Sequence, residues 1–279
     1  MNVLGVIAVA VFGLMIGSFL NVVVHRVPRG LSVVRPRSAC PDCGTPIGAR
    51  DNVPVLGWVL LKGRSRCCGS RISARYPLVE AGTAAAFVGV LLWRGWTWTL
   101  PAWWWFAAVG IALALIDLDV KKLPDVLTLP SYVVGALTLG GGLALDVVTG
   151  VGGTGVGNAG DVAHVMLRAG IACVAVWAWF YATFVIANLV YGQGGFGYGD
   201  VKLSGVLGLY LGSLGWPAVV LGVFAGYLVG GVVGVALLLT GAAGRRSRVP
   251  FGPFMIVGAW TAAVWGAPVA DWYLRLSGL

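Results

Sequence analysis

A series of long apolar stretches dominates this 279-residue chain. Hydrophobic residues make up 58% of it and charged residues only 10%, and the mean hydropathy is +0.89. A soluble globule of this size could not be coated with so little polar surface. Several stretches are long enough to cross about 30 Å of hydrocarbon as helices, and none alternates with the period of a barrel strand. The sequence therefore predicts an all-α polytopic membrane protein.

The apolar pattern predicts about eight transmembrane helices. The first lacks a basic leading segment and a small-residue cleavage site, so we expect it to remain uncleaved. The sixth is short, as is typical of segments that line a polar cavity within a membrane. The expected spans cover residues 3–24, 76–94, 102–118, 126–145, 165–190 and 201–211, with a seventh ending near residue 239 and an eighth starting at residue 254.

The polar segment after the first span sets the expected domains and orientation. Residues 25–75 carry ten Lys and Arg against two Asp, so the positive-inside rule places them in the cytoplasm. We expect a first transmembrane helix at 1–24, a cytoplasmic basic, cysteine-containing loop domain at 25–76 and a seven-helix membrane domain at 77–279. Eight spans then put both termini outside. The inner side of the cell membrane receives sixteen of the nineteen Lys and Arg, including Arg245, Arg246 and Arg248.

The formal net charge of +9 comes from basic residues in loops beside apolar spans. This placement favours lipid headgroups as the partner and argues against nucleic acid.

A glycine-rich stretch, GGFGYGDVKL at residues 194–203, contains the acid Asp200. Ionisable groups at membrane depth are costly and usually functional, and glycines let the backbone approach a bound chain closely. We expect Gly197, Gly199 and Lys202 to belong to a substrate-binding loop. The alternative is a solvated turn in which Asp200 caps a helix.

A second acid, Asp117, ends the third predicted span on the same cytoplasmic face as Asp200. Paired carboxylates allow one to take a proton from water while the other, protonated, polarises a carbonyl. Asp119 is expected to be solvated and Asp125 to cap the following helix. The rival interpretation is an ion-coupled transporter, because broken helices with carboxylates also build ion sites.

Four of the five cysteines lie in the basic loop, where Cys40 and Cys43 form a CxxC pair. A cytosolic CxxC suggests metal binding more than disulfides, and zinc requires four ligands. The second half of the site would come from Cys68 with either the adjacent Cys67 or a non-cysteine ligand. The alternative is a loop without metal, held by packing of its apolar residues Val53, Val55, Leu56, Trp58, Leu60 and Leu61.

Six motifs follow one another along the chain: GSFLNVVVHRVPRG, CPDC, RISARYPLVE, IDLDVKKLPD, GYGDVKL and VPFGPF. Together they resemble the type IV prepilin peptidases. GxGD alone is shared with presenilin-like and signal-peptide-peptidase-like proteases, whose YD and PAL signatures this sequence lacks.

The resemblance implies an aspartic endopeptidase that cuts the leader from prepilin or pseudopilin substrates at the cytoplasmic membrane face. It places the catalytic acids at Asp117 and Asp200 and the GxGD glycines at Gly197 and Gly199. For members with the cysteine loop it also implies methylation of the new N-terminus from S-adenosylmethionine. Ser65 stands where the family pattern has a cysteine, and an inactive prepilin-binding scaffold is a further alternative.

The orientation can be tested with single cysteines introduced into a background without native thiols. A cysteine at Ser38 should react with an impermeant thiol reagent only after the membrane is opened, because its loop is cytoplasmic. A cysteine at Gly153 should react in intact cells. The reverse pattern would contradict the predicted topology.

Overall fold

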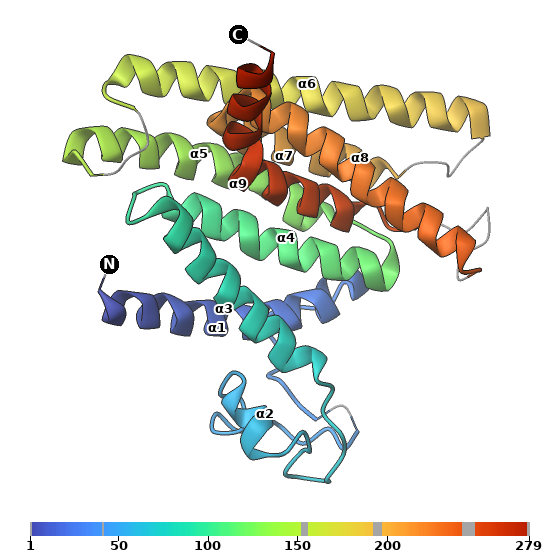
Figure 1. The fold of residues 1–279 in the computed structure, drawn as a ribbon. Helices are drawn as coiled ribbons and strands as arrows, with labels where there is room; N and C mark the ends of the chain where they lie inside the picture. The colour runs from blue at the N-terminus through green and yellow to red at the C-terminus, as the bar shows by residue number, and fades with distance from the viewer. Residues whose placement is uncertain (1, 41, 152–155, 192–196, 242–248, 278–279) are drawn as a thin grey trace. The chain divides into compact units, whose positions relative to one another are not determined.

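The computed structural model describes residues 2–40, 42–151, 156–191, 197–241 and 249–277 (Figure 1). Within these ranges the regular structure is helical, and pairing between extended segments is limited to isolated bridges. The all-α prediction is confirmed. Some positions named above lie outside the described residues, namely Gly153, Gly194, Arg245, Arg246 and Arg248.

Packing divides the chain into two units, Met1–Gly95 and Trp96–Leu279. The first contains α1 (Val3–Arg26), the short 3₁₀ turn η1 (Val27–Arg29), α2 (Leu56–Leu60) and α3 (Arg75–Arg94). Helix α3 belongs to this unit because it packs against α1. The domain boundary that the sequence predicts at residue 76 stays a prediction.

Two polar contacts join α3 to α1 and to the loop of the first unit. The Asn21 side chain of α1 donates to the Tyr76 carbonyl at 3.2 Å. The buried Glu80 carboxylate of α3 accepts the Val55 backbone N–H at 2.7 Å. Since Val55 has a left-handed backbone (φ 60°) directly before α2, Glu80 fixes the position at which the loop turns into that helix.

The second unit contains six helices: α4 (Leu100–Val120), α5 (Asp125–Thr149), α6 (Ala159–Tyr191), α7 (Tyr198–Leu214), α8 (Trp216–Leu239) and α9 (Gly252–Leu276). Within this unit α7 packs against α5, α6, α8 and α9 (Figure 1). Nearly every side chain of α7 from Asp200 to Gly212 is buried. An apolar helix enclosed in this way is the core of the unit.

Seven of the described helices are long and apolar enough to cross a membrane. The remaining long helix, α7, has 17 residues and corresponds to the short sixth span. It extends beyond the predicted range of 201–211 because Gly212 does not stop it. A Cβ on Gly212 would lie 2.8 Å from the Ala169 Cα, so this glycine serves close packing of α7 on α6.

An aromatic cluster joins three helices of the second unit. Phe106 of α4 stacks on Tyr210 of α7, with ring centroids 4.5 Å apart, and on the other side its ring lies 5.1 Å from Trp260 of α9. Trp103 of α4 contacts all three rings. The Tyr210 hydroxyl also donates to the Ala102 carbonyl at 3.1 Å. The cluster therefore fixes α4, α7 and α9 relative to one another.

Substitutions at Tyr210 should separate ring packing from its hydrogen bond. Tyr210→Ala should lower the free energy of unfolding by about 3–5 kcal/mol because it leaves a cavity among three helices. Tyr210→Phe removes only the hydroxyl and should cost about 1 kcal/mol. Thermal unfolding of the purified protein in detergent measures both. Equal losses for the two variants would contradict the packing role of the ring.

Candidate functional site

Asp117 lies in the last turn of α4 and is only 5% exposed. The helix ends just beyond it, where Lys121 adopts a left-handed conformation (φ 53°). The Asp117 Oδ2 accepts the backbone N–H of Gly252 at 3.0 Å. Gly252 is the first residue of α9, so this N–H is one of the donors that a helix start leaves without an intrahelical partner. The positive end of the α9 dipole therefore favours a negative charge on Asp117.

Asp200 lies in the first turn of α7 and is 8% exposed. Gly197 precedes this helix in an extended conformation, and its carbonyl accepts the Asp200 N–H at 3.2 Å. The Asp200 side chain turns back over Gly197, because a Cβ there would lie 3.0 Å from its Oδ2. The GxGD pattern thus starts a helix whose first turn carries a buried acid.

Leu123 lies between the starts of α7 and α9. A Cβ on Gly199 would lie 3.0 Å from the Leu123 Cβ. A Cβ on Gly252 would lie 3.4 Å from the Leu123 Cδ2 and 2.9 Å from the Asp117 Oδ2. The absence of side chains at both glycines lets the two helix starts close around Leu123 and brings Asp200 toward Asp117.

The two carboxylates are close enough to interact electrostatically. Both are buried at the ends of apolar helices, where two negative charges repel strongly because little water screens them. A pair of this kind favours one shared proton, which leaves one carboxylate and one carboxylic acid. That combination provides a general base and a general acid in one site.

Lys202 and Asp125 differ from their expected surroundings. The helix α5 begins at Asp125 itself, with Pro124 in the N-cap position, so the prediction that Asp125 caps the helix is wrong. The extended Pro124 (ψ 131°) leaves Asp125 inside the first turn, where both its oxygens lie 2.7 Å from the Lys202 Nζ. Asp119, in contrast, is exposed, as expected for a solvated acid.

Two residues of the site escaped the sequence analysis, Gly252 and Leu123. Gly252 lies in the VPFGPF motif, and its Gly-Pro pair is a recognisable helix start. No local pattern connects that start to an acid 135 positions earlier in the chain. Leu123 is a single apolar residue in a polar connection, and only the fold gives it a role.

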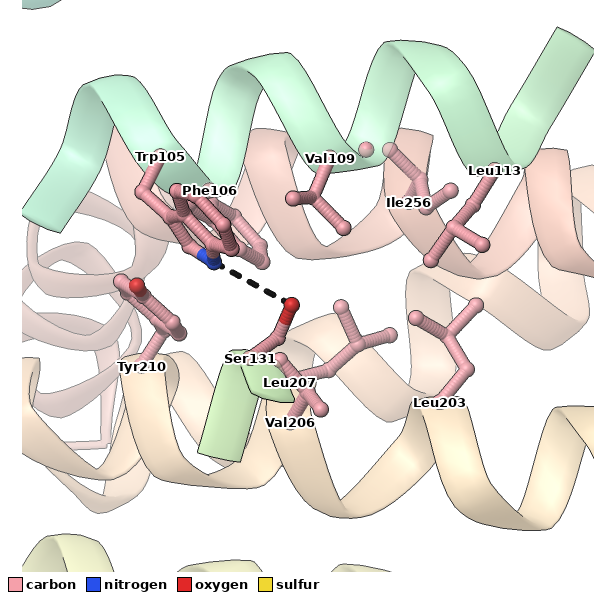
Figure 2. A pocket seen from close by; sticks show the side chains of 11 residues that line it. Trp105, Phe106, Val109, Leu113, Ser131, Leu203, Val206, Leu207, Tyr210 and Ile256 are labelled. Atoms are coloured by element: carbon pink, nitrogen blue, oxygen red, sulfur yellow. Dashed lines mark hydrogen bonds between the residues drawn. The ribbon is translucent and has the colours of Figure 1, made fainter. Parts of the chain in front are cut away.

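A small apolar cavity lies beyond the acids, between α4, α5, α7 and α9 (Figure 2). Leu113, Leu203 and Ile256 line one end of it, each one helical turn from Asp117, Asp200 or Gly252. The Trp105 indole N–H donates to the Ser131 hydroxyl at 3.1 Å and joins α4 to α5 there.

The loop of the first unit brings four cysteines together. The Sγ atoms of Cys40, Cys43, Cys67 and Cys68 all lie within 4.8 Å of one another. The Cys40–Cys68 and Cys43–Cys67 pairs are 3.6 Å and 3.1 Å apart. Tetrahedral zinc with bonds of about 2.3 Å places its sulfur ligands about 3.8 Å apart, so this donor set fits zinc.

Hydrogen bonds favour the thiolate form of Cys40 and Cys68. The pKa of Cys40 is lowered to about 5, chiefly because the backbone N–H groups of Cys43 and Asp42 donate to its sulfur. The Ser65 and Ser70 hydroxyls lower the pKa of Cys68. Although the Ser65 hydroxyl lowers it, the pKa of Cys67 is raised to about 11, because the neighbouring thiols and desolvation together outweigh that hydroxyl. Thiolates are the form of cysteine that binds metal. Ser65, the position that departs from the family pattern, thus lies with its hydroxyl among the sulfurs, 3.1 Å from Cys68.

Two family models match this chain. Residues 11–94 match the bacterial peptidase A24 N-terminal domain, and residues 104–235 match the type IV leader peptidase family. No solved structure matches.

Similar proteins over nearly the full length are named prepilin leader peptidase/N-methyltransferase. The protein from Aeromonas hydrophila is 37% identical, over 95% of this chain and 92% of its own. The Pseudomonas aeruginosa protein is 33% identical, over 98% and 94%. The Burkholderia pseudomallei protein is 33% identical, over 96% and 87%. The chain therefore belongs to the type IV leader peptidase family.

Proposed function

We propose that this chain is a membrane aspartic endopeptidase that removes the leader peptide of type IV prepilin-like proteins. The family and the names of its relatives support this activity. The observation that carries the mechanism is the convergence of two buried carboxylates, Asp117 and Asp200, at the ends of α4 and α7. A transporter would place such acids near the bilayer midplane, whereas these lie at helix ends.

The surroundings of each acid suggest its role. The N–H of Gly252 stabilises the negative charge of Asp117, which we assign as the general base. Asp117 takes a proton from water, whose oxygen then forms a bond to the scissile carbonyl carbon. Asp200 carries the shared proton, polarises the carbonyl oxygen and supplies a proton to the departing amine as the C–N bond breaks. Gly197, which has no side chain beside the Asp200 Oδ2, would let the substrate backbone approach the pair, whereas Gly199 packs on Leu123.

The second proposed activity is N-methylation of the new N-terminus. The relatives' names include N-methyltransferase, and S-adenosylmethionine is the methyl donor that we propose. We also propose that the loop domain and the acid pair face the cytoplasm, with both termini outside, on the basis of the Lys and Arg distribution. The basic loop would then lie against anionic lipid headgroups.

Zinc is the metal that we propose for the four-cysteine cluster. When bound, it would neutralise the thiolates and hold together a loop with few buried apolar residues. Cys67 would then supply the ligand that the family pattern places at Ser65. The short distances from Cys67 and Cys68 to the other two sulfurs support both as ligands.

Removing the carboxylate of either Asp117 or Asp200 tests the proposed acid pair. Asp117→Asn and Asp200→Asn should each lower prepilin cleavage at least about 1,000-fold, because either change removes the base or the acid of a single unit. Asp119→Asn is the matched control, since Asp119 is exposed in the same helix, and it should retain activity within a few fold. Cleavage of a purified prepilin is followed by the gel shift of the mature product. Prepilin cleavage at the normal rate by either Asn variant of the pair, with membrane insertion intact, would contradict the mechanism.

The metal prediction concerns protein purified without chelators. Elemental analysis should find close to one zinc per chain, and Cys40→Ser or Cys67→Ser should remove most of it. Ser65→Ala should keep the zinc, because the hydroxyl is not needed once Cys67 is a ligand. If Cys67→Ser keeps zinc and Ser65→Ala loses it, the ligand set is wrong. Prepilin cleavage should survive in all three variants, since the acids lie outside the loop.

A further inference from the structure

A second pair of charged groups, Asp125 and Lys202, joins the start of α5 to the first turns of α7. The Lys202 Nζ of α7 is 2.7 Å from both carboxylate oxygens of Asp125, the first residue of α5. The same ammonium group lies 5.0 Å from the ring centroid of Tyr198, in the first turn of α7. The Lys202 side chain is 23% exposed and the Asp125 side chain 55% exposed, so the pair lies at the protein surface with the lysine as its more enclosed member. The charge of Lys202 therefore interacts with two partners, Asp125 of α5 and Tyr198 of α7.

The backbone of Lys202 is held as well. The Tyr132 hydroxyl of α5 donates to the Lys202 carbonyl. The Tyr132 ring lies directly on Gly205 of α7, where a Cβ would overlap the ring at 2.9 Å. One helical turn of α7 is therefore fixed to α5 through both the side chain and the carbonyl of Lys202.

Asp200 is two residues before Lys202 in this turn. Any shift of the first turn of α7 moves Asp200 relative to Asp117, which the α9 start holds independently. A misplacement of about 1 Å is enough to cost a large factor in rate in a site of this kind. The contacts of Lys202 thus act on the geometry of the acid pair without touching it.

We propose that Asp125 and Lys202 are positioning residues: they fix the first turn of α7, which carries Asp200, and Asp125 neutralises the lysine charge on that turn. The proposal rests on the proposed peptidase function. It replaces the expectation that Lys202 belongs to a substrate-binding loop, because the amine is already engaged by Asp125. Neither Asp125 nor Lys202 has to contact the substrate in this role.

Other titratable or charged side chains lie on the elements around this turn and stay unchanged in the test. The first turn of α9, residues 252–255, contributes none. Those on α4, its connection to α5, α5 itself, α6 and α7, apart from the pair and the control residue Asp161, are Asp117, Asp119, Lys121, Lys122, Tyr132, Asp146, His164, Arg168, Cys173, Tyr181, Tyr191, Tyr198, Asp200 and Tyr210.

The test is the pH dependence of prepilin cleavage by the purified full-length protein in detergent. Asp125→Asn leaves a lysine charge without its partner, which favours the ionised acid pair, so the pH–rate profile should move about half a pH unit to lower pH. Lys202→Met leaves the Asp125 charge without its partner and should move the profile to higher pH by a similar amount. Both should lower kcat about tenfold or more because the turn is loosened.

Two further variants complete the design. The exchange Asp125→Lys with Lys202→Asp keeps one charge of each sign and should return the profile toward that of the wild type. Asp161→Asn is the matched control, because Asp161 is an acid in the first turn of α6 whose carboxylate accepts the Gly157 and Asn158 N–H groups, and an asparagine oxygen can accept them too. It should leave the profile unchanged.

Opposite shifts for the two single variants support the proposal. Shifts in the same direction, or lower rates with an unmoved profile, overturn it, because a merely structural pair has no charge-dependent effect. Failure of the wild type itself to cleave any prepilin would overturn the proposed function, and this inference with it.

Discussion

The cost of burying two carboxylates in an apolar helix bundle governs this structure. A buried charge without partners is expensive, so the protein has to supply donors where the chain offers few polar side chains. The start of α9 supplies one, because the Gly252 N–H has no intrahelical partner and points at Asp117. Every helix end leaves backbone groups without an intrahelical partner. Because both acids lie at helix ends, such groups are available to stabilise the site.

The rest of the second unit holds the ends of α4, α7 and α9 in fixed positions relative to one another. The aromatic cluster of Phe106, Tyr210 and Trp260 joins α4, α7 and α9 well inside the bundle. At the site itself, glycines let α7 and α9 close around Leu123. The aromatic cluster inside the bundle and the close approach of α7 and α9 at the site hold the two acids in place. In the part of the chain that the structure describes, no hydrogen bond joins the two carboxyl groups directly.

Much of this organisation could be predicted from the chain alone. Long apolar runs define the membrane class and most helices, and the clustering of Lys and Arg gives an orientation. The order of the spans predicts that Asp117 and Asp200 converge on one membrane face. Contacts between distant segments were not predictable, because neither the Gly252 N–H nor the Asp125–Lys202 pair leaves a local pattern. The local pattern after Pro124 therefore assigns Asp125 to a helix cap, which the structure contradicts.

The central claim is that Asp117 and Asp200 work as one unit, and the double variant tests it most directly. We would measure kcat/KM for prepilin cleavage by the two single Asn variants and by the variant that carries both. If the acids form one catalytic unit, the double variant should be only slightly slower than either single variant, because the first substitution already disables the pair. Losses that multiply would show two independent contributions and would contradict the account.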